Sequence, residues 1–567
     1  MQRRGKLAHI SPPRSSNMGS NDKLARRGLT NRLWVVVCAV LALFAFIHYV
    51  VPSFGGGSTP TYSNSDLKPK NYMNVSLEEA PNPFDFCPVY GPGDEVAAKH
   101  GALALSKTRM HLGSGARIQR VLHRALAGQP VTISVLGGSV SACHGAGDDP
   151  ISPRCWPSKF FQWWNSVFPH PASELTNGAM RRVNSEYFGF CSAHHLPDVT
   201  DLVIIELDAD DGTSNDFKTH FETLVRSILI RPDQPAVILL GHWSSQTHAI
   251  HGFAGPDHMH DIIAQFYDVP HVSTKALLYP DYMHEPTSIQ KYFVDPMLAN
   301  NLGHDLLADV LISYLQGQIC NAWSVFTGSA FDSVAANKDA TSGNGAAGLF
   351  GGLGQRKGVP EPGAPKDAKD EVDAEGNLID VDLDMDRGPG FGSGAGAHLN
   401  APSVPQAMID TRPDSAREFE EVDPFCASAN DLVNPLPPSL FYGSGWSAFH
   451  PPGGATSLTA KSHYWYASMP TSKLRIPIHV GKGDIGVYYL QEPASEVGEG
   501  SAVECWVDDN YAGAKMIENA ADVGEERAAL FMIDHWVSRG AHYVECVLMG
   551  DEGTSVPPFK IIGVFST

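Results

Sequence analysis

Residues 131–141 read Val131-Thr-Ile-Ser-Val-Leu-Gly-Gly-Ser139-Val-Ser141, a β-branched run that two glycines end just before a serine. Short, nearly continuous apolar runs of this kind are typical of strands that are buried on both faces. Two more runs follow, Asp201-Leu-Val-Ile-Ile-Glu-Leu207 and Ala236-Val-Ile-Leu-Leu240, with helix-length segments between them. Because strands that alternate with helices form parallel sheets, the pattern predicts an α/β fold with helices on both faces.

The spacing of apolar residues predicts two helices in the same region. Residues 217–230 and 302–315 each carry apolar side chains three and four positions apart, which places them on one helix face. These side chains are Phe221, Leu224, Val225 and Ile228 in the first helix, and Leu306, Leu307, Val310, Leu311 and Tyr314 in the second. We therefore expect residues 95–323 to form a three-layer α/β/α domain.

Two later segments differ from this domain in composition. Residues 435–567 contain alternating strands at short spacing with Gly and Asp turns, which predicts an antiparallel β-sandwich. Residues 324–434 are rich in Gly, Ala and Asp and lack apolar periodicity. A segment with so little apolar surface does not offset its ordering entropy, so we expect 324–434 to be a disordered insert.

An apolar run over residues 33–51 is close in length to the roughly 20 residues that cross a bilayer as a helix. The tail 1–32 contains a single acidic residue, Asp22, and these basic residues: Arg3, Arg4, Lys6, Arg14, Lys23, Arg26, Arg27 and Arg32. Positive charge keeps such a tail in the cytoplasm. We therefore expect a type II signal anchor, a stem over 52–94, and the remaining chain in the lumen of the Golgi and secretory pathway or at the cell surface. A cleaved signal peptide is the alternative, which the long run and the long basic tail disfavour.

The net charge bears on the kind of partner, and the cysteines bear on the compartment. The formal net charge of −21 disfavours nucleic acid as a partner. The cysteines outside the apolar run permit four disulfides; they are Cys87, Cys143, Cys155, Cys191, Cys320, Cys426, Cys505 and Cys546. We expect Cys505 and Cys546, both in the middle of predicted strands, to bond to each other. Asn74-Val-Ser76 is a glycosylation sequon on the expected lumenal side.

Four short blocks carry most of the information on function. They are Leu-Gly-Gly-Ser139-Val-Ser, Asn177-Gly178-Ala, the run from Asp201 to Asp211, and Asp295-Pro-Met-Leu298 with its continuation to His304. In this order they resemble the SGNH (GDSL-type) hydrolases, and more closely the fungal capsular associated proteins. The resemblance covers roughly residues 95–323, and the β-rich C-terminal region is also typical of that group. It implies an O-acyl esterase or acyltransferase that acts on cell-surface polysaccharide or assembles it, with no cofactor.

The resemblance also assigns roles to residues of the blocks. Ser139 takes the place of the nucleophile, and Gly178 that of the residue whose N–H helps to form the oxyanion hole. The last block supplies an Asp-x-x-His pair in which the histidine is the general base, so Asp295 takes the place of the orienting acid. A base is needed because a serine hydroxyl is a weak nucleophile until its proton is removed.

Two positions depart from this pattern. Asp210 stands where the third block supplies an asparagine to the oxyanion hole, and an ionised carboxylate repels a developing oxyanion. Leu298 stands where the catalytic histidine is expected. In a serine hydrolase, loss of that histidine costs on the order of a million-fold in turnover. The sequence therefore predicts that this chain is catalytically impaired.

Other histidines of the chain are candidates for a substitute general base or for metal ligands. His304 lies six residues after Leu298 and His284 precedes it, but a structural role is the better default for both. A further cluster contains His242, His248, His251, His258 and His260 near Asp257 and Asp261. It lacks the fixed spacing of known metal motifs, and the acidic run Asp208, Asp210 and Asp211 reads as a turn after a strand. We therefore expect no metal site.

Three functions remain open from the sequence. The first is an active glycan O-acyl esterase or acyltransferase with Ser139 as nucleophile. The second is an impaired member that binds a glycan or supports its assembly. The third is a scaffold in which the β-rich region is the working part. The resemblance favours the first, whereas Leu298 and Asp210 favour the second for this chain.

Overall fold

The computed structural model describes residues 64–74, 81–327, 403–412, 419–429, 442–449 and 463–567. The expected tail and anchor, residues 1–51, lie outside these ranges. Within them, no helix combines the length and the apolar character that crossing a bilayer requires.

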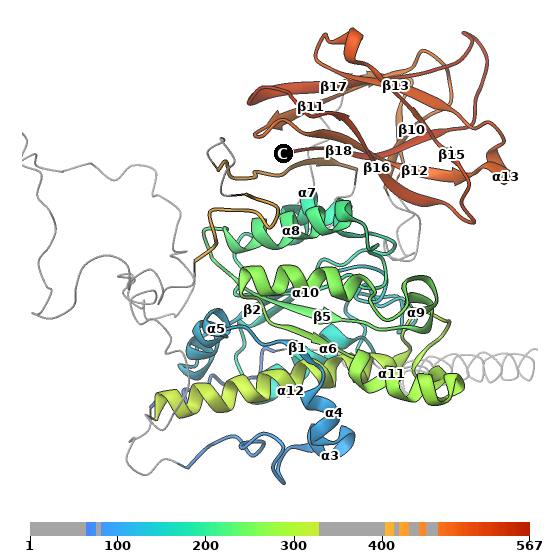
Figure 1. Cartoon of the computed structure of the whole chain (residues 1–567). Helices are drawn as coiled ribbons and strands as arrows, with labels where there is room; N and C mark the ends of the chain where they lie inside the picture. Colours follow the sequence, from blue (N-terminus) through green and yellow to red (C-terminus); the bar gives the residue numbers. More distant parts are fainter. Residues whose placement is uncertain (1–63, 75–80, 328–402, 413–418, 430–441, 450–462) are drawn as a thin grey trace, which may run out of the picture. The chain divides into compact units, whose positions relative to one another are not determined.

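A six-stranded sheet forms the centre of the α/β domain (Figure 1), in the order β1-β6-β5-β4-β2-β3. All neighbouring pairs are parallel except β1 with β6. The strands are β1 (Arg109–His111), β2 (Thr132–Gly137), β3 (Glu174–Asn177), β4 (Leu202–Glu206), β5 (Ala236–Gly241) and β6 (His271–Ser273). The three apolar runs of the sequence thus become the adjacent strands β2, β4 and β5, and the predicted parallel sheet is confirmed.

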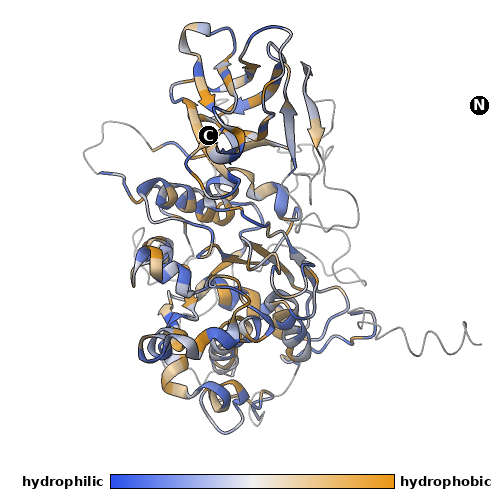
Figure 2. Cartoon of the chain, turned by 90° about the vertical axis from the view of Figure 1, so that its right-hand side faces the viewer, coloured by the Kyte–Doolittle hydropathy of each residue, from blue (hydrophilic) through white to orange (hydrophobic). Residues whose placement is uncertain are grey.

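Helices cover both faces of this sheet. One hydrophobic core joins the strands to α5 (Ala116–Leu126), α6 (Trp156–Val167) and α12 (Asn301–Phe326). The other joins them to α7 (Ser185–His195), α8 (Asn215–Leu229) and α10 (Pro256–Tyr267). Figure 2 shows the hydrophobic colouring along the strands between the two helical layers. The predicted three-layer arrangement and both predicted helices are confirmed, although α12 is longer than expected.

Shorter helices border the domain. They are α3 (Glu95–His100), α4 (Ala102–Ser106), α9 (Ser245–His251), α11 (Lys275–His284) and the 3-10 helix η1 (Pro286–Tyr292).

Two sheets form the predicted C-terminal β-sandwich. The first contains β7 (Phe425–Ser428), β9 (Ser447–Phe449), β10 (Tyr464–Ala467), β12 (Ile485–Pro493), β15 (Ala520–Ala521), β16 (Arg527–Asp534) and β18 (Phe559–Ser566). The second contains β8 (Tyr442–Ser444), β11 (Lys473–Val480), β13 (Ala502–Val507), β14 (Lys515–Glu518) and β17 (Gly540–Leu548). Two short helices, α13 (Ala494–Val497) and η4 (Tyr511–Gly513), lie between strands. Apolar side chains of both sheets share one core.

All eight cysteines outside the apolar run are paired, as Cys87–Cys320, Cys143–Cys155, Cys191–Cys426 and Cys505–Cys546. Cys505 and Cys546 lie directly opposite each other on β13 and β17, with their Cα atoms 4.1 Å apart. The predicted bond between them is therefore confirmed.

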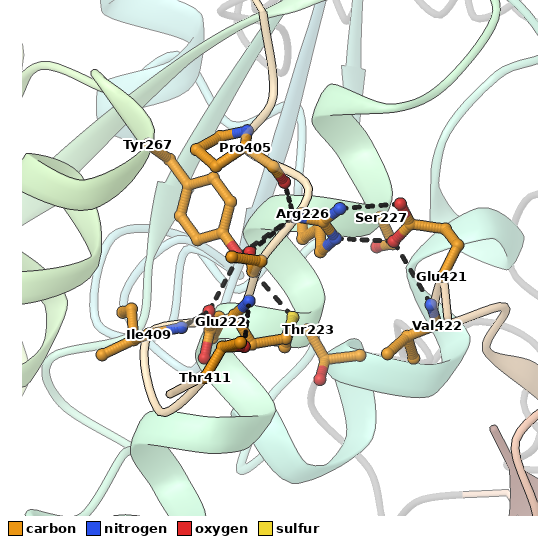
Figure 3. A network of polar contacts seen from close by, with 12 residues as sticks. Glu222, Thr223, Arg226, Ser227, Tyr267, Pro405, Ile409, Thr411, Glu421 and Val422 are labelled. Atoms are coloured by element: carbon orange, nitrogen blue, oxygen red, sulfur yellow. Dashed lines mark hydrogen bonds and ion pairs between the residues drawn. The ribbon is translucent and has the colours of Figure 1, made fainter. Parts of the chain in front are cut away.

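The expected insert over 324–434 is too long at its C-terminal end. Arg226 on α8 donates to the carbonyl oxygens of Pro405 and Ala407 and forms an ion pair with Glu421 (Figure 3). Ile409 packs on the second core. Because buried backbone carbonyls need donors, the guanidinium orders a segment whose composition alone predicts disorder. Strand β7 also belongs to the sandwich, so that domain begins before residue 435.

The expected stem over 52–94 is likewise too long. Tyr72 and Phe84 are buried in the first core, and the Tyr72 hydroxyl donates to the carbonyl oxygen of Val167. The Cys87–Cys320 disulfide then attaches the segment to α12. Aromatic burial and this covalent bond join residues 64–74 and 81–94 to the α/β domain. Asn74 of the sequon is exposed at the end of the first of these ranges.

Candidate active site

Ser139 lies just past the carboxyl end of β2, at the sheet edge where α/β folds place their ligands. It is 5% exposed. The preceding residue must be glycine, because a Cβ on Gly138 would lie 2.0 Å from an Asp210 carboxylate oxygen. The two glycines that end the β2 run therefore allow Asp210 to approach the serine.

Asp210 holds Ser139 by two hydrogen bonds. The Ser139 backbone N–H donates to Oδ2 at 2.7 Å, and the Ser139 hydroxyl donates to Oδ1 at 2.9 Å. The serine oxygen accepts a third hydrogen bond from the backbone N–H of Arg182 at 2.9 Å. Burial raises the pKa of Asp210 to about 6, although its hydrogen bonds from Ser139 act in the opposite direction. At neutral pH the residue is therefore mostly ionised.

Gly178 does not direct its N–H toward Ser139, contrary to the expectation from the resemblance. The N–H donates to the carbonyl oxygen of Val135 at 2.9 Å and so extends the pairing of β2 with β3. Glycine is required there for a packing reason, since a Cβ would lie 2.3 Å from the carbonyl oxygen of His195. Asp210 likewise accepts the Ser139 N–H, so neither of these two backbone N–H groups is free to donate to an oxyanion.

Asp295 and Leu298 form a tight turn beside the serine. Asp295 Oδ1 accepts the backbone N–H groups of Met297 and Leu298 at 2.8 and 2.6 Å. Leu298 is 9% exposed and lines the same cavity as Ser139 and Asp295. The structure thus brings the block together as the resemblance implies, with an apolar side chain where that family has its base.

His304 is fully buried and is not a lining residue of this cavity. Its Nδ1 accepts the backbone N–H of Trp156, the first residue of α6. Burial lowers the pKa of His304 to about 3, so the imidazole stays neutral. His304 therefore has the structural role that the sequence favoured, and the alternative of a substitute base is wrong. His284, exposed at the end of α11, does not line the cavity either.

The cavity around Ser139 has a volume of about 860 Å³ and is lined by both domains. The β-sandwich contributes Gln491 on β12 and residues 525–529, at the start of β16. An ion pair of 2.9 Å between Arg182 and Glu525 links the two sides. The space suits an extended polar molecule rather than a single small acyl group.

The sequence prediction missed one pair of residues that lines or borders this cavity. His144 lines it, and its Nδ1 lies 2.7 Å from the Asp148 carboxylate. The guanidinium of Arg181 contacts the other ring nitrogen, Nε2. A histidine five residues after the serine, with an aspartate four residues further on, was a signal in the sequence that could have identified this pair.

The acidic run after β4 has a separate role. His260 on α10 lies between Asp208 and Asp211, with its ring nitrogens 2.7 and 2.9 Å from their oxygens. Although burial lowers its pKa, the hydrogen bonds to Asp208 and Asp211 outweigh this effect and raise the pKa of His260 to about 10. A buried imidazolium thus bridges two carboxylates of the run and offsets one of their two negative charges. Within the described ranges, no three His, Cys, Asp or Glu side chains are grouped to hold a metal ion.

Comparison with known proteins shows the fold. No protein-family model matches the chain, and no curated protein matches it significantly. Among solved structures the chain is similar to a two-domain esterase active on acetylated mannans, co-crystallised with mannopentaose. The alignment covers 82% of this chain and 97% of the esterase, at 18% identity and a TM-score of 0.54. A second structure of a two-domain esterase active on acetylated mannans aligns with 82% of this chain and 98% of its own, at 18% identity and a TM-score of 0.53. The chain therefore shares the two-domain architecture of this esterase.

Proposed function

We propose that this protein binds O-acylated polysaccharide in the cavity around Ser139 and that its ester turnover there is impaired. The observation that carries the proposal is the pair of hydrogen bonds from Ser139 to Asp210. The carboxylate accepts the Ser139 N–H and so occupies the position that an oxyanion stabilised by this N–H would take. An ester carbonyl that developed negative charge there would meet an existing negative charge.

The lack of a histidine at position 298 also slows ester turnover. Leu298 has no titratable group, and no histidine of the last block lines the cavity. Serine hydrolases depend on both features, so a site that lacks both retains its shape for binding while chemistry at Ser139 is slow.

The choice of ligand rests on the cavity and on the comparisons. A polar space of about 860 Å³, walled by two domains, fits several sugar units. One structural neighbour is an esterase active on acetylated mannans, and the sequence blocks resemble capsular associated proteins. The expected anchor over 33–51 adds the location: we place the protein on the lumenal or extracellular face of a secretory-pathway membrane.

A binding assay combined with an esterase assay tests this function. Acetylated mannan should bind the wild-type protein and Ser139→Ala equally well in isothermal titration calorimetry. Binding should be lost in Ala529→Trp, which fills the cavity from β16. Fast hydrolysis by the wild type that disappears in Ser139→Ala would show instead an active esterase.

Residual ester hydrolysis with His144 as base is the second candidate function. His144 lines the cavity, and Asp148 is placed to orient its ring as in a catalytic triad. It ranks second because the Arg181 guanidinium contacts Nε2, the atom that would have to take the serine proton. Slow hydrolysis that His144→Ala removes, and that is labelled by a serine-directed inhibitor, would support it.

A further inference from the structure

A second, smaller cavity of about 270 Å³ opens at the carboxyl end of β6. It shares no lining residue with the cavity around Ser139. The residues that define it include Phe253, Asp257, Ser273, Lys275 and Tyr279. Ligands of α/β proteins bind at this edge of the sheet, so the position itself is one where a ligand is expected.

Aromatic side chains form the wall of this cavity. The ring of Phe253 is 60% exposed and packs edge-on against Tyr279, with the ring centroids 4.9 Å apart. Met110, 37% exposed, borders the same space. An apolar surface held open beside polar groups is typical of binding sites rather than of ordinary protein surface.

A buried ion pair lies at the inner end of the cavity. The Lys275 ammonium donates to Asp257 at 2.7 Å and to the carbonyl oxygen of Phe253, and it lies 4.0 Å from the centroid of the Phe253 ring. An ammonium group has three hydrogens to donate. Among the described residues these are the two acceptors it has, which leaves one hydrogen for a ligand oxygen.

The buried charges of this cavity cancel each other, because Asp257 is paired with Lys275. The other lysine of the lining, Lys107, is exposed, so water screens its charge and the inner part of the cavity favours a neutral ligand. The combination of an aromatic wall and a single buried donor suits a ring with apolar faces and hydroxyl groups at its edge. A sugar ring has this character.

Helix α9 connects the two cavities. Gln246, in its first turn, lines the large cavity, and Phe253, two residues past its end, lines the small one. At 1.5 Å per helical residue, Gln246 and the last residue of the helix, His251, are about 7.5 Å apart along the axis, and Phe253 follows two residues later. A glycan chain of a few units that lies along α9 reaches both cavities.

We propose that the small cavity binds one sugar ring of the same neutral glycan that the large cavity holds near Ser139. The inference rests on the proposed function and deepens it, because it makes α9 part of an extended binding surface. It follows that affinity depends on chain length, and that Phe253 contributes to the binding of long oligosaccharides only.

Titration calorimetry with mannopentaose, xylopentaose and mannobiose tests the inference. Phe253→Ala should weaken the binding of one pentaose or both by about tenfold and leave mannobiose binding unchanged. Leu112→Ala is the matched control: it also removes an exposed apolar side chain, 45% exposed, but it lies after β1, outside both cavities. Unchanged thermal unfolding of each variant shows that the fold is intact.

Ala529→Trp, which blocks the large cavity, separates this inference from the proposed function. If pentaose binding falls in both Phe253→Ala and Ala529→Trp, both proposals stand. A loss in Ala529→Trp alone overturns the small-cavity site and leaves the proposed function in place. A loss in Phe253→Ala alone supports the small cavity as a sugar site and overturns the role of the large one. No wild-type binding of either pentaose overturns the small-cavity site, whereas the proposed function is overturned only if acetylated mannan also fails to bind.

Discussion

The carboxylate of Asp210 accepts both hydrogens that Ser139 can donate, the backbone N–H at 2.7 Å and the hydroxyl at 2.9 Å. An acyl-enzyme reaction needs these two hydrogens to go elsewhere, the first to an oxyanion and the second to a base. Asp210 therefore affects both the stabilisation of an oxyanion and the transfer of the serine proton to a base.

Buried Glu206, at the end of β4, should make stability fall as the pH rises. Burial raises its pKa from 4.5 to about 8, and its side chain accepts a hydrogen bond from Ser141 at 2.7 Å. Between these two pH values the folded protein keeps a proton that the unfolded chain releases, so the free energy of unfolding decreases with increasing pH. Glu206→Gln replaces the carboxyl group by an amide that does not titrate. The melting temperature of this variant should exceed that of the wild type by a few degrees at pH 8 but not at pH 4. An equal difference at both pH values would contradict the assignment.

Replacing His260 should destabilise the domain. His260→Asn removes the imidazolium that bridges Asp208 and Asp211, and breaking a buried charge pair costs roughly 3–5 kcal/mol. Chemical denaturation measures the loss. His258→Ala, two residues earlier on α10 and exposed, is the control and should change stability by less than about 0.5 kcal/mol. Similar stability of the two variants would mean that the buried triad is not a source of stability.

Arg226 should determine whether residues 403–412 stay docked on α8. Its side chain is 2% exposed and bonds to two backbone carbonyls of the segment, so Arg226→Ala should cost roughly 2 kcal/mol. Thermolysin, which cleaves before large apolar residues, should also cut at Ile409 faster than in the wild type. Lys218→Ala, which removes an ion pair to the mostly exposed Asp410, is the control and should have an effect below about 1 kcal/mol. Unchanged cleavage in Arg226→Ala would show that other contacts hold the segment.

The sequence predicted those parts of the fold whose information is local. The apolar runs that became β2, β4 and β5 are continuous, so each one indicates a buried strand whatever side chains pack around it. The docking of residues 403–412 was missed because it depends on Arg226, about 180 positions earlier in the chain, and no local pattern records that contact. Composition therefore predicted disorder where one buried guanidinium imposes order.

The candidate site was predicted as a set of residues but not as a geometry. Ser139, Asp210, Asp295 and Leu298 do line one cavity. The direction of the Gly178 N–H was not predictable, because it depends on the register between β2 and β3. The wall from the β-sandwich was also missed, since residues 525–529 carry no motif and reach the site only through the packing of two domains.

The last prediction concerns the recovery of ester turnover. Leu298→His places an imidazole in the cavity next to Asp295, whose Oδ1 holds the turn while no described residue bonds its Oδ2. That oxygen is available to accept the Nδ1–H of the new histidine and fix its tautomer. A positioned base contributes roughly a hundredfold or more, so hydrolysis of a generic acyl ester should rise by at least that factor.

Asp210→Asn completes the change, because the amide NH2 can donate to an oxyanion and the single amide oxygen replaces two charged acceptors of Ser139. The double variant Leu298→His with Asp210→Asn should therefore be faster than either single variant, and Ser139→Ala in that background should abolish the activity. Leu298→Asn is the control for polarity at position 298, since it adds hydrogen-bonding groups without a base. Hydrolysis that stays at the wild-type level in the double variant, with the fold intact and binding of acetylated mannan retained, would show that Leu298 and Asp210 are not what limits this site.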